Sequence, residues 1–143
     1  MMSAVKQSKW LAQVEIEIPF YDLDPVNIVW HGNYPKYFEL ARCALLEQFN
    51  YGYNAMKESG YIWPIIDLHI RYIKPLVFKQ RVVVDAVLKE WEYRLKIDYL
   101  IRDAVTQARL TKGSTTQVAV DIKTKELCLI SPSILVERLG VPR

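Results

Sequence analysis

The sequence predicts an α+β domain in which a strongly bent, curved antiparallel β-sheet wraps around one long central helix. Residues 13–20, QVEIEIPF, alternate apolar and polar side chains at period two, as a half-buried strand does. Residues 33–50 instead repeat apolar side chains at helical spacing. Four or five further strands follow from residue 65 onward. One helix covers a sheet of that size only if the sheet curls around it.

The length and composition indicate one domain, which we assign to residues 1–143. A chain of 143 residues with 51% hydrophobic residues can bury a substantial core. No apolar run approaches the ~20 residues of a membrane span, and the N-terminal MMSAVKQSKWLAQ lacks the apolar segment of a signal peptide. We therefore expect a cytoplasmic protein. Cys43 and Cys128 are expected to be reduced thiols, because they suggest neither a disulfide framework nor a metal site.

The charge of the chain is only mildly basic. Its net charge is +3, and no block of five like charges occurs. This balance argues against a nucleic-acid-binding protein, which usually concentrates Lys and Arg on one face. It is compatible with a small phosphorylated ligand.

The ends of the first strand and of the helix contain residues suited to those positions. Pro19 has no N–H to donate, so its position should face a sheet edge or a bulge. Asn33 can cap the helix, and Pro35 fits a first turn, where the N–H would have no partner. Gly52 is expected to mark the helix end, and residues 54–59 to add a short helical turn.

The rest of the chain alternates at period two. In residues 65–73, IIDLHIRYI, polar residues separate the apolar side chains Ile66, Leu68, Ile70 and Tyr72. Further strands are expected over residues 81–90, 94–103 and 109–130, the last as one strand or two with a turn near residues 123–125. The tail, residues 132–140, is expected to form a last helical turn. The uncovered sheet face and the edge strands invite pairing with a second copy of the chain.

The stretch FYDLDPVNIVWHGNY, residues 20–34, admits two interpretations. On the structural one, Asp22 and Asp24 end the first strand, because Asp-Pro pairs commonly start turns. On the functional one, backbone N–H groups of His31, Gly32 or Asn33 at the positive end of the helix hold a developing oxyanion. A carboxylate of the preceding loop then attacks a carbonyl or activates a water. The spacing permits both.

Residues 21–42, YDLDPVNIVWHGNYPKYFELAR, resemble the motif of the 4-hydroxybenzoyl-CoA thioesterase family. The segment IRYIKPLVFKQRVVV is similar to a second part of the family pattern, and the resemblance extends over almost the whole chain. Members of this family are acyl-CoA thioesterases with the hotdog fold. The resemblance therefore implies a hotdog fold and hydrolysis of an acyl thioester.

The resemblance also implies roles for individual residues. Asp24 matches the family's catalytic carboxylate, as nucleophile or general base, and Asp22 matches the aspartate that we assign to orienting the loop. His31 matches the first position of the central helix, where the backbone N–H contacts the thioester carbonyl. The start of that helix is completed by Gly32, Asn33 and Tyr34.

Two positions depart from the family pattern. Asn27 stands where the family usually has Gly. Since Asn is the non-Gly residue that best tolerates a positive φ, we expect the loop conformation to be kept. Gln80 stands where the family usually has Asp or Glu after a proline, so no role is carried over to it.

Several side chains outside the motif are weaker candidates. Arg71 and Lys74 could meet the phosphate groups of coenzyme A, although solvated strand charges are the simpler interpretation. Glu39 lies on the helix, where it could face the pocket, and His69 is interpreted as a surface or interface histidine. Three aromatic residues could line an acyl pocket or pack in the core or a dimer contact: Trp30, Tyr61 and Trp63.

The sequence thus predicts an acyl-CoA thioesterase without metal or redox cofactor that forms a homodimer or a homotetramer, a dimer of dimers. One alternative is a thioesterase that acts on acyl carrier protein in a fatty-acid, polyketide or polyene pathway, which a basic rim would support because the carrier is acidic. A second alternative is a non-catalytic acyl-thioester-binding protein, which would not need Asp24. A hotdog-fold dehydratase fits residues 20–34 poorly.

Overall fold

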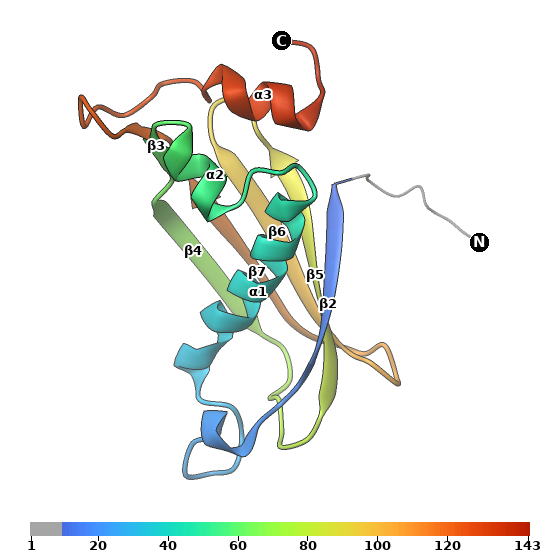
Figure 1. The fold of residues 1–143 in the computed structure, drawn as a ribbon. Coiled ribbons are helices and arrows are strands. Elements are labelled where there is room, and N and C mark those ends of the chain that lie inside the picture. The colour runs from blue at the N-terminus through green and yellow to red at the C-terminus, as the bar shows by residue number, and fades with distance from the viewer. Residues whose placement is uncertain (1–9) are drawn as a thin grey trace.

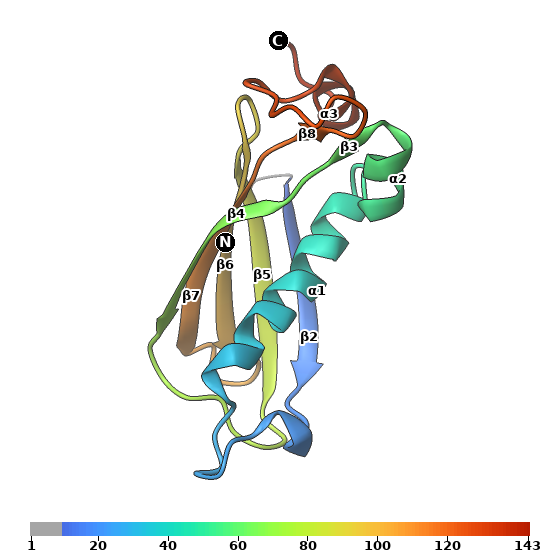
Figure 2. The same ribbon diagram turned by 90° about the vertical axis from the view of Figure 1, so that its left-hand side faces the viewer.

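Five antiparallel strands form the main sheet of the protein, whose computed structural model describes residues 10–143. The spatial order of these strands is β2 (Leu11–Glu17), β5 (Arg81–Glu90), β6 (Leu95–Asp103), β7 (Arg109–Gln117) and β4 (Ile65–Tyr72). β2 and β4 are therefore the two edges of the sheet (Figure 1). Two short strands, β3 (Tyr61–Ile62) and β8 (Val120–Asp121), pair with each other near one end of the molecule (Figure 2).

The helix α1 (Tyr34–Glu47) lies across the inner face of this sheet, which curves around it (Figure 2). It packs mainly against β2 and β5. The period-two pattern of β5 buries Val82, Val84 and Ala86 completely on the helix side. The predicted α+β architecture, a bent antiparallel sheet around one long helix, is confirmed.

Four shorter helical segments connect or follow these elements. They are η1 (Phe20–Asp22), η2 (His31–Asn33), α2 (Tyr53–Glu58) and α3 (Ser133–Leu139). α2 confirms the short helical turn predicted after the long helix, and α3 confirms the one predicted in the tail. α3 is followed by Gly140, whose φ of +70° is the left-handed cap conformation that favours glycine.

Several element boundaries differ from the prediction. The first strand ends at Glu17, because Pro19 has no N–H to continue the ladder of backbone hydrogen bonds. Phe20 begins a 3₁₀ turn instead, and 68% of the surface of Phe20 is exposed. Asn33 makes no side-chain cap; its Nδ2 instead donates to the backbone carbonyl of Asp22 at 2.9 Å. α1 ends at Glu47, and Gly52 instead immediately precedes α2. The predicted strand over residues 109–130 is divided into β7 and the short β8.

The inner face of β4 is only partly covered. Ile65, Leu68 and Tyr72 have 43%, 41% and 46% of their surface exposed, because α1 packs toward the other side of the sheet. A bulge between Ile65 and Asp67 interrupts the pairing with β7, so Ile66 does not continue the alternation as predicted. The sheet thus offers an edge strand with a partly apolar inner face beside the helix.

Within residues 10–143, none of the helices combines the length and apolar character that crossing a membrane requires. Most of the N-terminal segment for which we predicted no signal peptide, residues 1–9, lies outside the described residues.

Candidate active site

The loop between β2 and α1 folds into a tight turn that carries Asp24. The Asp24 N–H donates to the Ile28 carbonyl at 2.8 Å, and the Asn27 N–H donates to the Asp24 carbonyl at 3.0 Å. Asn27 has a φ of +67°, in the left-handed region, so the expectation that it keeps the conformation of a glycine is confirmed. This turn holds the backbone of Asp24 from both sides.

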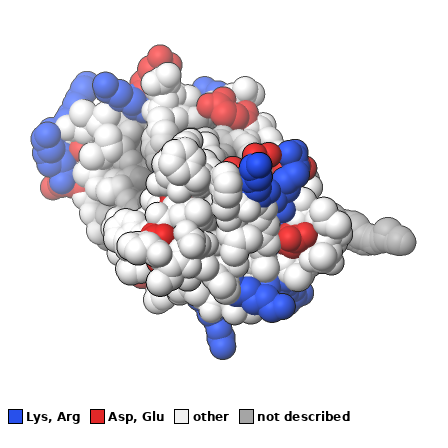
Figure 3. Space-filling model, turned by 90° about the horizontal axis from the view of Figure 1, so that it is seen from below, with Lys and Arg blue, Asp and Glu red and all other residues white. Residues whose placement is uncertain are grey.

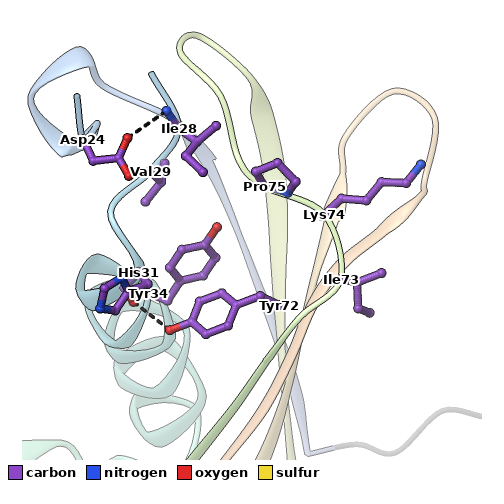
Figure 4. Close-up of a pocket in the computed structure, with 9 residues that line it drawn as sticks. All are labelled: Asp24, Ile28, Val29, His31, Tyr34, Tyr72, Ile73, Lys74 and Pro75. Atoms are coloured by element: carbon purple, nitrogen blue, oxygen red, sulfur yellow. Dashed lines mark hydrogen bonds between the residues drawn. The ribbon is translucent and has the colours of Figure 1, made fainter. Parts of the chain in front are cut away.

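The Asp24 carboxylate lies at a cavity of about 280 Å³ between the loop, the start of α1 and the chain after β4 (Figure 4). Its Oδ1 accepts hydrogen bonds from the N–H groups of Val26 at 2.9 Å and of Ile28 at 3.4 Å. Both bonds orient the carboxylate. Since both bonds use Oδ1, Oδ2 has no hydrogen-bond donor among residues 10–143 and is available for a substrate or a water.

The 3₁₀ turn η2, which leads directly into α1, contributes His31 to the same cavity. Among residues 10–143, the backbone N–H groups of His31 and Gly32 find no protein acceptor, whereas the N–H of Asn33 donates to the Trp30 carbonyl at 2.9 Å. Unpaired N–H groups at a helix start can stabilise a negative charge. The His31 carbonyl accepts a hydrogen bond of 2.8 Å from the Tyr72 hydroxyl, which ties the helix start to the end of β4 (Figure 4).

Gly32 lies directly under the Trp30 ring. A Cβ added at Gly32 would lie 2.3 Å from Trp30 Cζ3, far inside van der Waals contact. Any larger residue would displace the indole, which also lies against the His31 ring at 5.1 Å between centroids. Gly32 thus keeps the helix start compact, although it does not itself line the cavity.

Asp22 is buried, with only 3% of its surface exposed, and faces α1. Its Oδ1 lies 2.7 Å from the Lys36 ammonium, and its Oδ2 accepts a 2.6 Å hydrogen bond from the Tyr37 hydroxyl. Burial, together with this bond to the carboxylate, raises the pKa of the Tyr37 phenol. Asp22 therefore fastens the loop to the first turn of the helix and does not line the cavity at Asp24.

Comparisons with known proteins agree with this geometry. The family model described as "Thioesterase-like superfamily" matches residues 18–137, a span that includes the loop, α1 and the whole sheet after it. The chain belongs to this superfamily. It is 27% identical over 112 residues to "Putative acyl-CoA thioesterase YneP" of Bacillus subtilis, a match that covers 78% of this chain and 80% of the relative.

Solved structures place this thioesterase-like protein in the hotdog fold. A DHNA-CoA thioesterase from Staphylococcus aureus superposes with a TM-score of 0.76 and is 26% identical, covering 83% of this chain and 80% of its own. A 1,4-dihydroxy-2-naphthoyl-CoA thioesterase from Synechocystis superposes with a TM-score of 0.80, covering 92% and 99% of the two chains. At 17% identity, the latter shows the fold alone.

Only some of the other residues predicted for the site line the cavity. Tyr34 and Lys74 line the cavity with Asp24, but Asn27, Asn33 and Glu39 do not. Tyr34 is 2% exposed, and its hydroxyl accepts the Leu76 N–H at 3.4 Å. The structure therefore assigns Tyr34 a wall position in this cavity.

Arg71 lies on the outer face of β4, where it pairs across the strands with Lys112. Together with Arg109, these two residues border a hollow that also includes Tyr72 and Ile73, two residues of the Asp24 cavity. Sequence reasoning missed Arg109 and Lys112, because their approach to Arg71 depends on strand register: Lys112 lies opposite Arg71, and Arg109 lies opposite Arg102 of β6. Basic side chains are thus grouped next to the cavity mouth.

The end of the molecule that carries the loop is otherwise weakly charged. Uncharged side chains cover most of this face, and Lys and Arg lie mainly toward its edges (Figure 3). The exposed apolar side chains there include Phe20, Tyr21, Val26 and Phe78. The surroundings of the site therefore combine apolar surface with a few cations.

Gln80 and His69 lie outside the cavity. Gln80 accepts the Val77 N–H at 3.1 Å and donates to Asp103 Oδ2 at 2.9 Å, and this bond, with two backbone N–H bonds, lowers the pKa of Asp103 to about 2. His69 is exposed on the outer face of β4, with Nε2 3.2 Å from the Asp67 carboxylate. Both side chains hold local structure.

Proposed function

We propose that this thioesterase-like protein hydrolyses acyl-CoA thioesters to a free acid and CoA. The observation that carries the proposal is one cavity lined by both Asp24 and His31 of η2, the 3₁₀ turn that leads into α1. Acyl transfer to water needs a carboxylate on one side of the carbonyl and hydrogen-bond donors on the other. The superfamily membership and the names of the relatives support the same reaction.

Asp24 acts in one of two ways. As a general base, it removes a proton from water while the water oxygen bonds to the thioester carbonyl carbon; the C–S bond then breaks and the CoA thiolate takes up the proton. As a nucleophile, its carboxylate oxygen bonds to that carbon and expels the thiolate, and water then hydrolyses the mixed anhydride. In both routes, the free N–H groups of His31 and Gly32 stabilise the oxyanion.

The neighbouring residues have supporting roles in this proposal. Asp22 and Asn27 hold the loop, Asn33 ties it to the helix through the Asp22 carbonyl, and Tyr34 forms a wall of the cavity. Lys74, Arg71, Arg109 and Lys112 meet the phosphates of CoA near the cavity mouth. No metal or redox cofactor enters the reaction in this proposal.

A second copy of the chain completes the assembly in our proposal. β4 is an edge strand, so one side of it has backbone N–H and C=O groups that a partner strand can pair with. Pairing of β4 with its own copy would continue the sheet across a homodimer, from which a dimer of dimers could form. Sedimentation equilibrium should give a dimer or tetramer; a monomer at micromolar concentration would exclude this assembly.

The basic group at Arg71, Arg109 and Lys112 supports a second candidate, hydrolysis of acyl groups on acyl carrier protein. An acidic carrier protein would contact such a group favourably. Lys112→Glu separates the two candidates: it should reduce kcat/KM mainly with carrier-bound substrate if the carrier is the natural partner. Equal losses for CoA and carrier substrates would favour acyl-CoA, whose phosphates contact the same cations.

The decisive experiment is a free-thiol assay over short, medium, long and aromatic acyl-CoAs, including 4-hydroxybenzoyl-CoA, with wild type and Asp24→Asn. We expect Asp24→Asn to lower kcat by about 10²–10⁴-fold or more, because it removes the only carboxylate proposed to act on the carbonyl. Asp67→Asn, which changes an exposed aspartate on the outer face of β4, is the matched control and should be near wild type. Near wild-type turnover by folded Asp24→Asn would refute the proposed chemistry.

A further inference from the structure

A second and larger cavity, of about 550 Å³, opens beside α1 between α2 and the segment that runs from β3 into β4. Its walls are mostly apolar and aromatic, with Tyr53, Met56, Tyr61, Trp63 and Ile65 among them. Arg42 of α1 also lines it. A cavity of this size can hold the distal part of an organic ligand.

Arg42 is an unusual wall residue, because only 2% of its surface is exposed. Its Nη2 donates to Glu39 Oε1 and to the Tyr53 hydroxyl, and that hydroxyl in turn donates to Glu39 Oε2 at 2.6 Å. Among residues 10–143, however, its Nε and Nη1 atoms are buried and have no hydrogen-bond acceptor. Buried N–H groups without an acceptor reduce the stability of the fold, and an acceptor oxygen from outside the described residues would remove this cost.

The charges of the cluster indicate what kind of oxygen fits. The Glu39 carboxylate already neutralises the Arg42 guanidinium, and hydrogen bonds from Arg42 and Tyr53 help lower the Glu39 pKa against the effect of burial. A ligand carboxylate would meet the field of Glu39 as well as that of Arg42. A hydroxyl or carbonyl oxygen avoids this repulsion and still accepts from the free N–H groups.

The two cavities lie along the same two elements. On α1, Tyr34 lines the first cavity and Arg42 lines the second. Arg42 lies eight positions after Tyr34, which is a rise of ~12 Å along the helix axis. On β4, Tyr72 lines the first cavity and Ile65 lines the second. The half-exposed Leu68 lies between these two residues. An acyl chain that begins at Asp24 and follows α1 therefore meets an apolar strand and then Arg42.

We propose that the second cavity is a specificity site for the far end of the acyl group, where Arg42 binds an uncharged oxygen. This inference rests on the proposed thioesterase function, because it places the thioester at Asp24. The substrate class is then an acyl thioester whose extended chain spans the ~12 Å between the two cavities and carries a distal hydroxyl or carbonyl group.

The test compares dodecanoyl-CoA, 12-hydroxydodecanoyl-CoA and dodecanedioyl-CoA with wild type and with Arg42→Lys. Lysine keeps the positive charge beside Glu39 but removes the Nε and Nη1 donors. We expect the kcat/KM of wild type to be about tenfold or more higher for the hydroxy substrate than for dodecanoyl-CoA. A hydrogen bond from a charged donor stabilises a complex by an amount that corresponds to such a ratio. Arg42→Lys should reduce this ratio to about one.

Arg94→Lys is the matched control, since Arg94 pairs with Glu90 and lines neither cavity. It should keep the wild-type ratio. An equal ratio in wild type and Arg42→Lys would overturn the proposal. A preference of wild type for dodecanedioyl-CoA over the hydroxy substrate would overturn the inference that the oxygen is uncharged.

Binding of the free acids provides a readout that does not depend on hydrolysis. Titration of 12-hydroxydodecanoate and dodecanoate can be followed by tryptophan fluorescence, because Trp63 lines the cavity. Wild type should bind 12-hydroxydodecanoate about tenfold more tightly than dodecanoate. Arg42→Lys should weaken that preference. If Arg42→Lys unfolds, Tyr53→Phe should weaken it instead. If wild type hydrolyses no acyl-CoA, the proposed function fails, whereas equal binding of the two acids overturns the specificity site itself.

Discussion

Replacing Asp22 by Asn should destabilise the protein, although Asp24→Asn should not. Asp22 is buried and accepts from two donors, the half-exposed Lys36 ammonium at 2.7 Å and the Tyr37 hydroxyl at 2.6 Å. An amide keeps one acceptor oxygen but turns an NH₂ group toward the other donor. Loss of one buried hydrogen bond to a charged group costs ~1.5–3 kcal/mol. The Lys36 pair adds at most ~0.5 kcal/mol, because solvent screens its exposed end.

We therefore expect a loss of roughly 2–3 kcal/mol in the free energy of unfolding for Asp22→Asn. Urea unfolding at fixed protein concentration, followed by tryptophan fluorescence, measures it. Asp24→Asn should lie within about 0.5 kcal/mol of wild type, since the Asn oxygen can still accept from Val26 and Ile28. Turnover of Asp22→Asn should fall less than that of Asp24→Asn, because the loop is displaced and the reacting carboxylate is kept.

The result that refutes this reasoning is a reversal of the two effects on stability. If Asp22→Asn unfolds at the same urea concentration as wild type, its carboxylate does not fasten the loop to α1. If Asp24→Asn is the less stable variant, Asp24 has a structural role that its two backbone bonds do not explain.

Three further predictions follow from local geometry. Asn27 has a φ of +67°, so Asn27→Ala should lower the free energy of unfolding by ~1 kcal/mol and Asn27→Gly by less than about 0.5 kcal/mol, as measured in urea. Equal effects of the two substitutions would argue against backbone strain at this position. Gly113→Ala should cost ~1–3 kcal/mol, because a Cβ there would lie 2.4 Å from the Phe38 ring and 2.8 Å from the His69 carbonyl oxygen; an unchanged urea midpoint would contradict this. Burial raises the pKa of Tyr99 to about 12, so the folded state holds the phenol proton more tightly than the unfolded state does. The free energy of unfolding should therefore fall between pH 10 and 12. Urea titrations of Tyr99→Phe should show a shallower fall over that range.

The strands, the long helix and the loop with Asp24 could be predicted from the sequence, because each depends on near neighbours in the chain. Period-two alternation placed β5 at residues 81–90, where the structure has it. The motif around Asp24 and His31 lies within eight residues, so one turn and one helix start bring both side chains to the same cavity. Asn27 could be assigned a positive φ for the same local reason.

Other features depend on contacts between segments far apart in the chain. The register of β7 with β4 and with β6 decided that Arg71 lies near Lys112 and Arg109, and no periodicity encodes that register. The prediction that Asn33 caps the helix with its side chain was wrong, because the Asp22 carbonyl folds back within its reach.

The sequence by itself determined the order of the strands and the long helix, the turn with a positive φ at Asn27, and the superfamily. Only the tertiary structure decided that Asp22 is buried under the loop while Asp24 faces a cavity, and that Arg42 is enclosed beside Glu39 and Tyr53. The physical reason is that burial and hydrogen-bond partners are set by how the helix crosses the sheet. That crossing is a property of the whole core and not of any short segment.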